Sequence, residues 1–124
     1  MITFTLPWPT RDLSPNGRLH WAAKAKAVAK ARKVAYLTTR EATASYWVAL
    51  YGVQDHEKIS VRMACVPATR RRRDMDNLIA STKAYRDGIA DALGINDSRF
   101  VIINELWDEY IKGGEVRVTL KTVS

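Results

Sequence analysis

The chain has 124 residues, enough for one compact domain that buries roughly two-thirds of its extended-chain surface without disulfide bonds. Apolar residues make up 47% and charged residues 27% of the sequence, which excludes a disordered chain. A net charge of +7 favours a polyanionic partner such as nucleic acid, an anionic membrane or a ribosome. No apolar run approaches the ~20 residues of a membrane span, and the first residues do not resemble a signal peptide.

The basic and acidic residues are unevenly distributed along the chain. Residues 1–73 contain 14 basic and 4 acidic residues, a net charge of +10, whereas residues 74–124 contain 6 basic and 9 acidic residues, a net charge of −3. The sign changes between Arg73 and Asp74. The single cysteine, Cys65, excludes an internal disulfide and favours a cytoplasmic protein. Because Cys65 lies within an apolar run, we expect it to fill the core.

The first half of the chain predicts a strand followed by a long helix. Residues 2–6 alternate β-branched and aromatic side chains, typical of a strand, and prolines follow. Residues 20–44 contain no glycine or proline and are rich in helix formers. Four cations share one face of this helix, which either contacts DNA phosphates or is only a solvated face, and an apolar stripe is expected on another side. The cations are Lys26, Lys30, Lys33 and Arg40, and the stripe comprises Trp21, Ala25, Val28, Ala35 and Tyr36.

The second half of the chain predicts strand, helix and two further strands. Residues 58–66 alternate as in a half-buried strand, and Asp76 and Asn77 are suitable N-caps for a helix over 78–92 that stops at Gly94. Residues 100–110 and 115–123 are expected strands, and the turn at 112–114 predicts a hairpin between them. This order predicts an α/β (α+β) fold, a small mixed sheet of about four strands flanked by two main helices.

The most informative stretch is TRRRRDMDNL, residues 69–78. Its four arginines repel one another and suit phosphodiesters, which guanidinium groups bind bidentately; they are Arg70, Arg71, Arg72 and Arg73. Asp74 and Asp76 would point to the same side of an extended backbone, as the start of a Mg²⁺ site, with Mn²⁺ as an alternative ion. Such an ion would bridge to a phosphate and activate a water. Alternatively, Asp76 and Asn77 only cap a helix and Asp74 only pairs with the arginines.

Further carboxylates and one lysine follow this motif. Asp97 would join the aspartate pair if the strand after it lies near the strand that ends at Val66; otherwise it is a turn residue. Lys83, seven residues after Asp76, would lie on nearly the same helical side and neutralise phosphate charge, or would be a plain surface lysine. Asp87 and Asp91, spaced i and i+4, are expected on a solvated helix face.

The motifs RRRRDMDNL and GINDSRFV resemble the RusA family of Holliday-junction resolvases, small homodimeric endodeoxyribonucleases. The opening TFTLPWP and the closing KGGEVRVTL also fit this family, so the resemblance covers most of the chain. It implies a RusA-like fold and implies that Asp74, Asp76 and Asp97 are catalytic Mg²⁺ ligands. In contrast to the family, Asn96 occupies the first of two frequently acidic positions, and Lys83 follows the motif asparagine by six residues rather than three. Asp108 and Glu109 also stand where relatives are often basic.

Three hypotheses of function remain open at this point. The first is a Mg²⁺-dependent, structure-selective endonuclease that resolves four-way DNA junctions as a homodimer by paired symmetric nicks. The second is a non-catalytic basic DNA-binding module, and the third is an RNA-binding or ribosome-associated protein. Under the first hypothesis, Trp8 and Trp21 either pack in the core or stack on an unpaired base at the junction.

Overall fold

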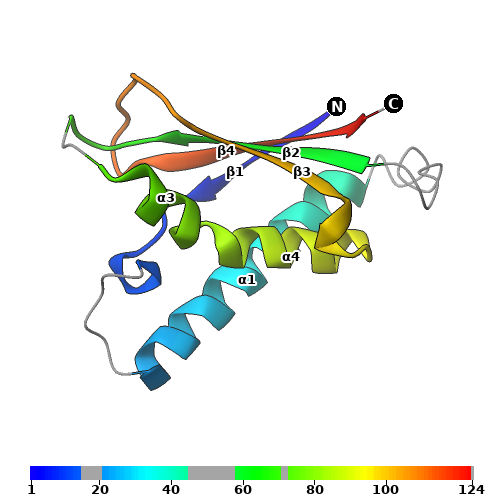
Figure 1. The fold of residues 1–124 in the computed structure, drawn as a ribbon, viewed down its shortest axis with the longest axis horizontal. Helices are drawn as coiled ribbons and strands as arrows, with labels where there is room; N and C mark the ends of the chain where they lie inside the picture. Colours follow the sequence, from blue (N-terminus) through cyan, green and yellow to red (C-terminus); the bar gives the residue numbers. More distant parts are fainter. Residues whose placement is uncertain (15–20, 45–57, 71–72, 124) are drawn as a thin grey trace.

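A four-stranded mixed sheet with helices on one face forms the fold (Figure 1). The structure is a computed structural model that describes residues 1–14, 21–44, 58–70 and 73–123. The strands are β1 (Ile2–Pro7), β2 (Lys58–Val66), β3 (Phe100–Leu106) and β4 (Glu115–Val123), in the order β1-β4-β2-β3. β3 runs parallel to β2, and β4 lies antiparallel to β1 and β2. The predicted fold class is confirmed.

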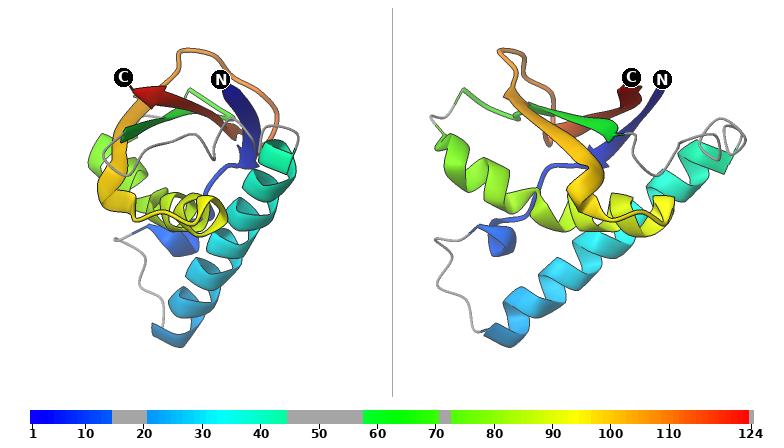
Figure 2. Two further views of the ribbon diagram at one scale, coloured as in Figure 1. Left: turned by 90° about the vertical axis from the view of Figure 1, so that its right-hand side faces the viewer. Right: turned by 45° about the vertical axis from the view of Figure 1, so that its right-hand side comes forward.

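Three α-helices and two short 3₁₀ turns complete the described chain. They are α1 (Trp21–Thr43), α3 (Met75–Ser81) and α4 (Lys83–Leu93), with the turns η1 (Arg11–Leu13) and η3 (Asp97–Arg99). The two views of Figure 2 show that the helices lie on the same side of the sheet. Among the described residues, no helix combines the length and apolarity needed to cross a membrane.

Alternating side chains of the strands form the core between the sheet and the helices. β2 lies between β4 and β3, and its inward residues are fully buried, as are those of β4. These inward residues are Ile59, Val61, Met63 and Cys65 in β2 and Val116, Val118 and Leu120 in β4. Cys65 is 1% exposed, which confirms its predicted place in the core. Its burial raises the pKa of the thiol to about 11, so the group is neutral near pH 7.

α1 and α4 approach each other closely at Gly88. A Cβ atom at this position would overlap the carbonyl oxygen of Arg32 and would lie 2.9 Å from the Cβ of Ala35. The absent side chain therefore allows the two helix backbones to meet. Gly94 ends α4 with a left-handed φ of 68°, as predicted for a helix C-terminus.

The predicted apolar stripe of α1 was wrong in its first half. Trp21 is 76% exposed and Ala25 is also exposed, whereas the buried residues are Ala31, Ala35, Thr39 and Thr43. Figure 2 shows the reason, because the N-terminal half of α1 projects beyond the sheet and α4. Burial of α1 begins at Ala27, which packs partly buried against the core, and continues from Ala31 onward.

The predicted helix over 78–92 was also wrong in its bounds. The helical segment begins at Met75 and is divided into α3 and α4 at Thr82. The Thr82 hydroxyl donates to the carbonyl oxygen of Ile79 at 2.9 Å and lies 3.5 Å from Oδ1 of Asn104 in β3. This buried contact fixes the junction of the two helices against the edge strand.

The predicted hairpin between the last two strands was wrong, because β3 and β4 are not neighbours in the sheet. β3 ends at Leu106, not near residue 110. It pairs in parallel with β2, and the helices α3 and α4 form the crossover that connects the two strands. β4 pairs with β1 and β2 instead. The segment 107–114 consequently passes over the end of β2. Its glycine turn, at Gly113 and Gly114, closes a longer connection.

Candidate functional site

A cleft of about 330 Å³ opens where β2 and β3 end. We name it the arginine cleft; it is lined by Pro67, Thr69, Arg70, Arg73, Leu106, Trp107, Asp108 and Tyr110. These residues come from the segment after β2 and from the connection between β3 and β4. Figure 1 shows both segments at the same end of the sheet as the start of α3. The topology that excludes a hairpin therefore also creates the cleft.

Backbone hydrogen bonds hold the walls of the arginine cleft together. The Trp107 amide donates to the carbonyl oxygen of Cys65 at 2.9 Å, and the Ile111 amide donates to that of Pro67 at 3.1 Å. Gly114 approaches Trp8 so closely that an added Cβ would lie 3.2 Å from the indole side chain. The connection is thus fixed to the end of β2 and to the residues after β1, and the cleft has a defined shape.

Guanidinium groups lie over aromatic rings around this cleft. Arg70 lies 5.5 Å from the ring centroid of Tyr110, and Arg73 lies 5.1 Å from that of Trp8. Arg73 also donates to the carbonyl oxygen of Thr69 at 2.9 Å. Such cation–π contacts orient the two cations at the cleft, where guanidinium groups suit an anion. Arg71 and Arg72, predicted to bind DNA with them, lie outside the described residues.

The aromatic residue Trp107 has its own cationic neighbour. Arg117 of β4 lies 5.2 Å from the Trp107 ring centroid and forms ion pairs with Glu115 at 2.8 Å and Glu109 at 3.5 Å. Glu109, which stands where relatives of the RusA family are often basic, therefore helps to hold Arg117 against the tryptophan. These carboxylates also reduce the positive charge that Arg117 offers to a ligand.

Asp74 and Asp76 lie at the N-terminus of α3, directly after Arg73. Asp74 is the N-cap, and its Oδ1 accepts from the amides of Asp76 at 2.9 Å and Asn77 at 3.4 Å. The predicted cap residues, Asp76 and Asn77, were wrong by two and three positions because the helix begins earlier. The backbone is also not extended through both aspartates, since Asp76 is already helical. Both side chains are exposed, so their carboxylates are open to water, a cation or a phosphate.

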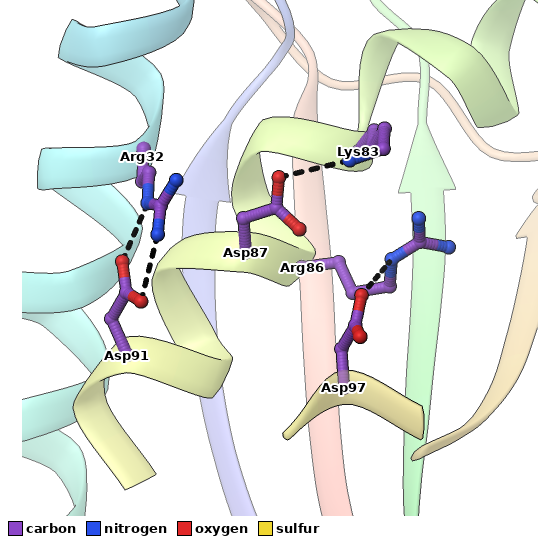
Figure 3. A network of polar contacts seen from close by, with 6 residues as sticks. All are labelled: Arg32, Lys83, Arg86, Asp87, Asp91 and Asp97. Carbon is purple, nitrogen blue, oxygen red and sulfur yellow. Dashed lines mark hydrogen bonds and ion pairs between the residues drawn. The ribbon is translucent and has the colours of Figure 1, made fainter. Parts of the chain in front are cut away.

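Asp97 lies apart from this aspartate pair. It begins η3, before β3, and the parallel register places this segment beside the start of β2, whereas Asp74 follows the end of β2. Figure 1 shows η3 and the start of α3 at opposite ends of the helical crossover. Asp97 instead faces Arg86 of α4, with Oδ2 3.8 Å from Nε (Figure 3). That separation makes an ion pair but exceeds a hydrogen bond.

The other carboxylates and the lysine of α4 form ion pairs of their own (Figure 3). Lys83 donates to Asp87 at 3.1 Å, one helical turn away. Asp91 accepts from Arg32 of α1 at 2.5 and 2.9 Å, and this guanidinium lowers the pKa of the Asp91 carboxyl. Asp91 thus bridges two helices, whereas the sequence predicted only a solvated position for it. Lys83 has a carboxylate neighbour that competes with its predicted role toward phosphate.

The three aspartates do not form one metal-ligand set within the described part of a single chain. No group of three or more His, Cys, Asp or Glu side chains able to hold a metal occurs among these residues. Asp74 and Asp76 nevertheless fit Mg²⁺, which proteins commonly bind through one or two carboxylates together with waters and a substrate phosphate. The donor chemistry therefore fits an ion shared with a phosphate, but Asp97 of the same chain is not part of that set.

The predicted cationic face of α1 is exposed throughout. Lys26, Lys30, Lys33 and Arg40 all have exposed side chains. Lys26 and Lys30 belong to the projecting half of the helix, while Arg40 lies 5.9 Å from the ring centroid of Tyr36 in the packed half. This surface is accessible to a polyanion but lies on a different element from the arginine cleft.

The sequence did not predict that Trp107 and Tyr110 line the arginine cleft. Both fall in a segment that was expected to continue a strand, where they would alternate between faces of a sheet. The available signal was the density of aromatic residues beside a Lys-Gly-Gly turn. Only the route of the connection over β2 places them opposite Arg70 and Arg73.

Comparison with known proteins gives one relationship that covers the whole chain. No protein-family model matches the sequence. An uncharacterized protein of Xylella fastidiosa (strain Temecula1 / ATCC 700964) is 42% identical over 124 residues, which are 100% of this chain and 78% of that protein. The chain belongs to the same family as this Xylella protein.

Proposed function

We propose that the protein is a Mg²⁺-dependent, structure-selective endodeoxyribonuclease that resolves four-way (Holliday) DNA junctions by paired symmetric nicks, as a RusA-like resolvase of recombination and repair. The observation that carries the proposal is the arginine cleft, whose Arg73 immediately precedes the exposed carboxylates of Asp74 and Asp76. Cations that bind a phosphodiester thus lie beside ligands for a cation that would act on it. The proposal places this activity in the cytoplasm.

In this proposal, basic residues of the chain bind DNA and acidic residues hold the metal ion. Arg70 and Arg73 would bind backbone phosphates, since guanidinium groups match phosphate geometry bidentately. The exposed lysines of α1 would extend the contact to a second stretch of backbone. Asp74 and Asp76 would hold Mg²⁺, or Mn²⁺ in its place. When bound, this ion supplies Lewis-acid polarisation of the scissile phosphate and lowers the pKa of a water.

Asp97 and Lys83 belong to the proposed site on the strength of the RusA resemblance. Within one chain Asp97 pairs with Arg86 and Lys83 with Asp87. A site that combines Asp97 with Asp74 therefore needs a second copy of the chain, which agrees with the proposed homodimer. A two-fold dimer also matches the symmetry of a junction that is cut at two related points.

A cleavage assay on a labelled four-way junction and a matching linear duplex tests this function. We expect paired nicks on the junction with Mg²⁺ and none with EDTA. Asp74→Asn should reduce cleavage at least about a hundredfold, because even outer partners of metal ligands contribute 10- to 100-fold. Asp91→Asn, which removes a carboxylate paired with Arg32 outside the proposed site, is the matched control on α4 and should retain cleavage. Junction binding without cleavage in Mg²⁺ or Mn²⁺ would contradict the nuclease, and equal cleavage of duplex would contradict junction selectivity.

A non-catalytic DNA-binding module is the second candidate. It is favoured by the absence, among the described residues, of any group of three metal-binding side chains. On this alternative Asp74 serves as the N-cap of α3 only. Asp74→Ser would then preserve the cap and DNA binding, and neither the wild type nor any variant would yield a cleavage product.

A further inference from the structure

The arginine cleft has the size and lining of a site for a single nucleotide. Its volume of about 330 Å³ lies at the lower end of the range of about 300–1,000 Å³ found for small-molecule sites. A DNA duplex, whose major groove alone is about 12 Å wide, does not enter a space of this size. One unpaired nucleotide extruded from its stack is compatible with it.

The lining separates into aromatic and cationic parts that correspond to the two parts of a nucleotide. Trp107 and Tyr110 come from the connection between β3 and β4, and Tyr110 is 38% exposed. Arg70 and Arg73 come from the segment after β2. Asp108 lies among the lining residues next to the aromatic pair, so repulsion directs a phosphate toward the two arginines.

We propose that the arginine cleft binds one unpaired nucleotide of a DNA strand at the branch point of the junction. The base stacks against Tyr110 and Trp107 in competition with the guanidinium groups of Arg70 and Arg117, which lie over these rings, and its phosphate is bound by Arg70 and Arg73. This inference rests on the DNA substrate of the proposed function, but it does not depend on cleavage. Base stacking on aromatic side chains tolerates every base, because each base has a π-face.

The rigidity of the walls supports a preformed site. Hydrogen bonds to the carbonyl oxygens of Cys65 and Pro67 fix the aromatic segment, and the contact of Gly114 with Trp8 fixes its end. Aromatic rings already held in place lose little conformational freedom on stacking, so their contact contributes more to binding. Arg73 lines the cleft and directly precedes Asp74 in the chain. The DNA strand that carries the bound nucleotide would therefore pass close to Asp74 and Asp76.

A binding experiment without cleavage tests this site. Two four-way junctions are compared in Ca²⁺, one fully paired and one carrying a single unpaired 2-aminopurine at the branch point. We expect the wild-type protein to quench the 2-aminopurine fluorescence and to bind this junction more tightly than the paired one. Tyr110→Ala should lower this selectivity between about fivefold and 150-fold, the equivalent of one aromatic–base stack. Tyr110→Phe keeps the ring and should retain it.

Trp21→Ala is the control for loss of an exposed aromatic residue elsewhere, because Trp21 lies at the far end of α1. It should leave the ratio of the two affinities unchanged. Equal binding of both junctions by the wild-type protein, or unchanged selectivity in a folded Tyr110→Ala variant, would overturn the site. Displacement by an equal concentration of free thymidine monophosphate would assign the cleft to a free nucleotide and would also overturn it. Junction cleavage in Mg²⁺ is measured separately, so the nuclease and the nucleotide site can fail independently.

Discussion

Two regions of this protein use the same residue types in different ways. Around the arginine cleft, Arg70 and Arg73 lie over aromatic rings, and the nearby Asp74 and Asp76 are exposed. Along α4 and in η3, Asp87, Asp91 and Asp97 each face a cation of the same chain. Carboxylates that are already paired with cations serve the packing of helices, whereas exposed carboxylates beside an open cleft can serve a ligand. The partners of a charged side chain, and not its residue type, therefore separate structural charges from candidate functional charges.

The largest expected effect comes from mixing two variant subunits. This experiment tests whether Asp97 serves only its ion pair with Arg86 or also the proposed metal site. A mixed dimer of Asp74→Asn and Asp97→Asn chains, isolated with two different affinity tags, should regain single nicks on a four-way junction. If each site combines Asp74 of one chain with Asp97 of the other, one of the two sites in this dimer is intact. Each parent homodimer should be inactive, so recovery is measured against no background.

The outcomes of this experiment distinguish a site shared between two subunits from one that does not use Asp97. A mixed dimer as inactive as its parents would contradict a shared site. Full cleavage by Asp97→Asn alone would leave Asp97 as the ion-pair partner of Arg86 and remove it from the proposed ligand set. Thermal unfolding of each variant distinguishes lost chemistry from lost structure.

The salt dependence of DNA binding tests the cationic side of the comparison. The slope of the logarithm of the binding constant against that of salt concentration changes by about 0.9 for each phosphate contact on duplex DNA. Arg73→Gln should reduce the slope by about one such contact. Arg32→Gln, which removes a cation already paired with Asp91, is the matched control and should leave the slope unchanged.

The same measurement on α1 sharpens the assignment of its exposed lysines. Lys30→Gln should also reduce the slope by about one contact if the projecting half of the helix binds DNA backbone. An unchanged slope would leave these lysines as a solvated helix face. The arginine cleft would then be the main cationic surface supported by the binding data.

The smallest expected effect is the pH dependence of the ion pair between the helices. Because Arg32 lowers the pKa of Asp91, the ion pair stabilises the fold above the unfolded value of 3.8. This contribution is lost as pH falls through the lower folded pKa. The difference in melting temperature between wild type and Asp91→Asn should therefore be present at about pH 6 and vanish toward about pH 2. A difference that does not change with pH would contradict this role of Asp91.

Local sequence patterns predicted many of the elements but not their neighbours. Alternation identified all four strands, because inward positions such as Val61 and Val118 must be apolar wherever the strands pair. The glycine turn after the third predicted strand predicted a hairpin, yet β4 pairs with β1 and β2. A turn signal reports the conformation of a few residues, while strand order depends on which strands the α3–α4 crossover brings together.

Local sequence features were sufficient to predict the fold class and the burial of Cys65, and to identify the basic segment followed by the aspartate pair. These properties depend on composition, periodicity and residues adjacent in the chain. Long-range packing was needed to bring Trp107 and Tyr110 into one cleft with Arg70 and Arg73, and to place Asp97 beside Arg86. The physical reason is that these contacts join segments separated by strand pairing and by a helical crossover, whose path no local pattern specifies.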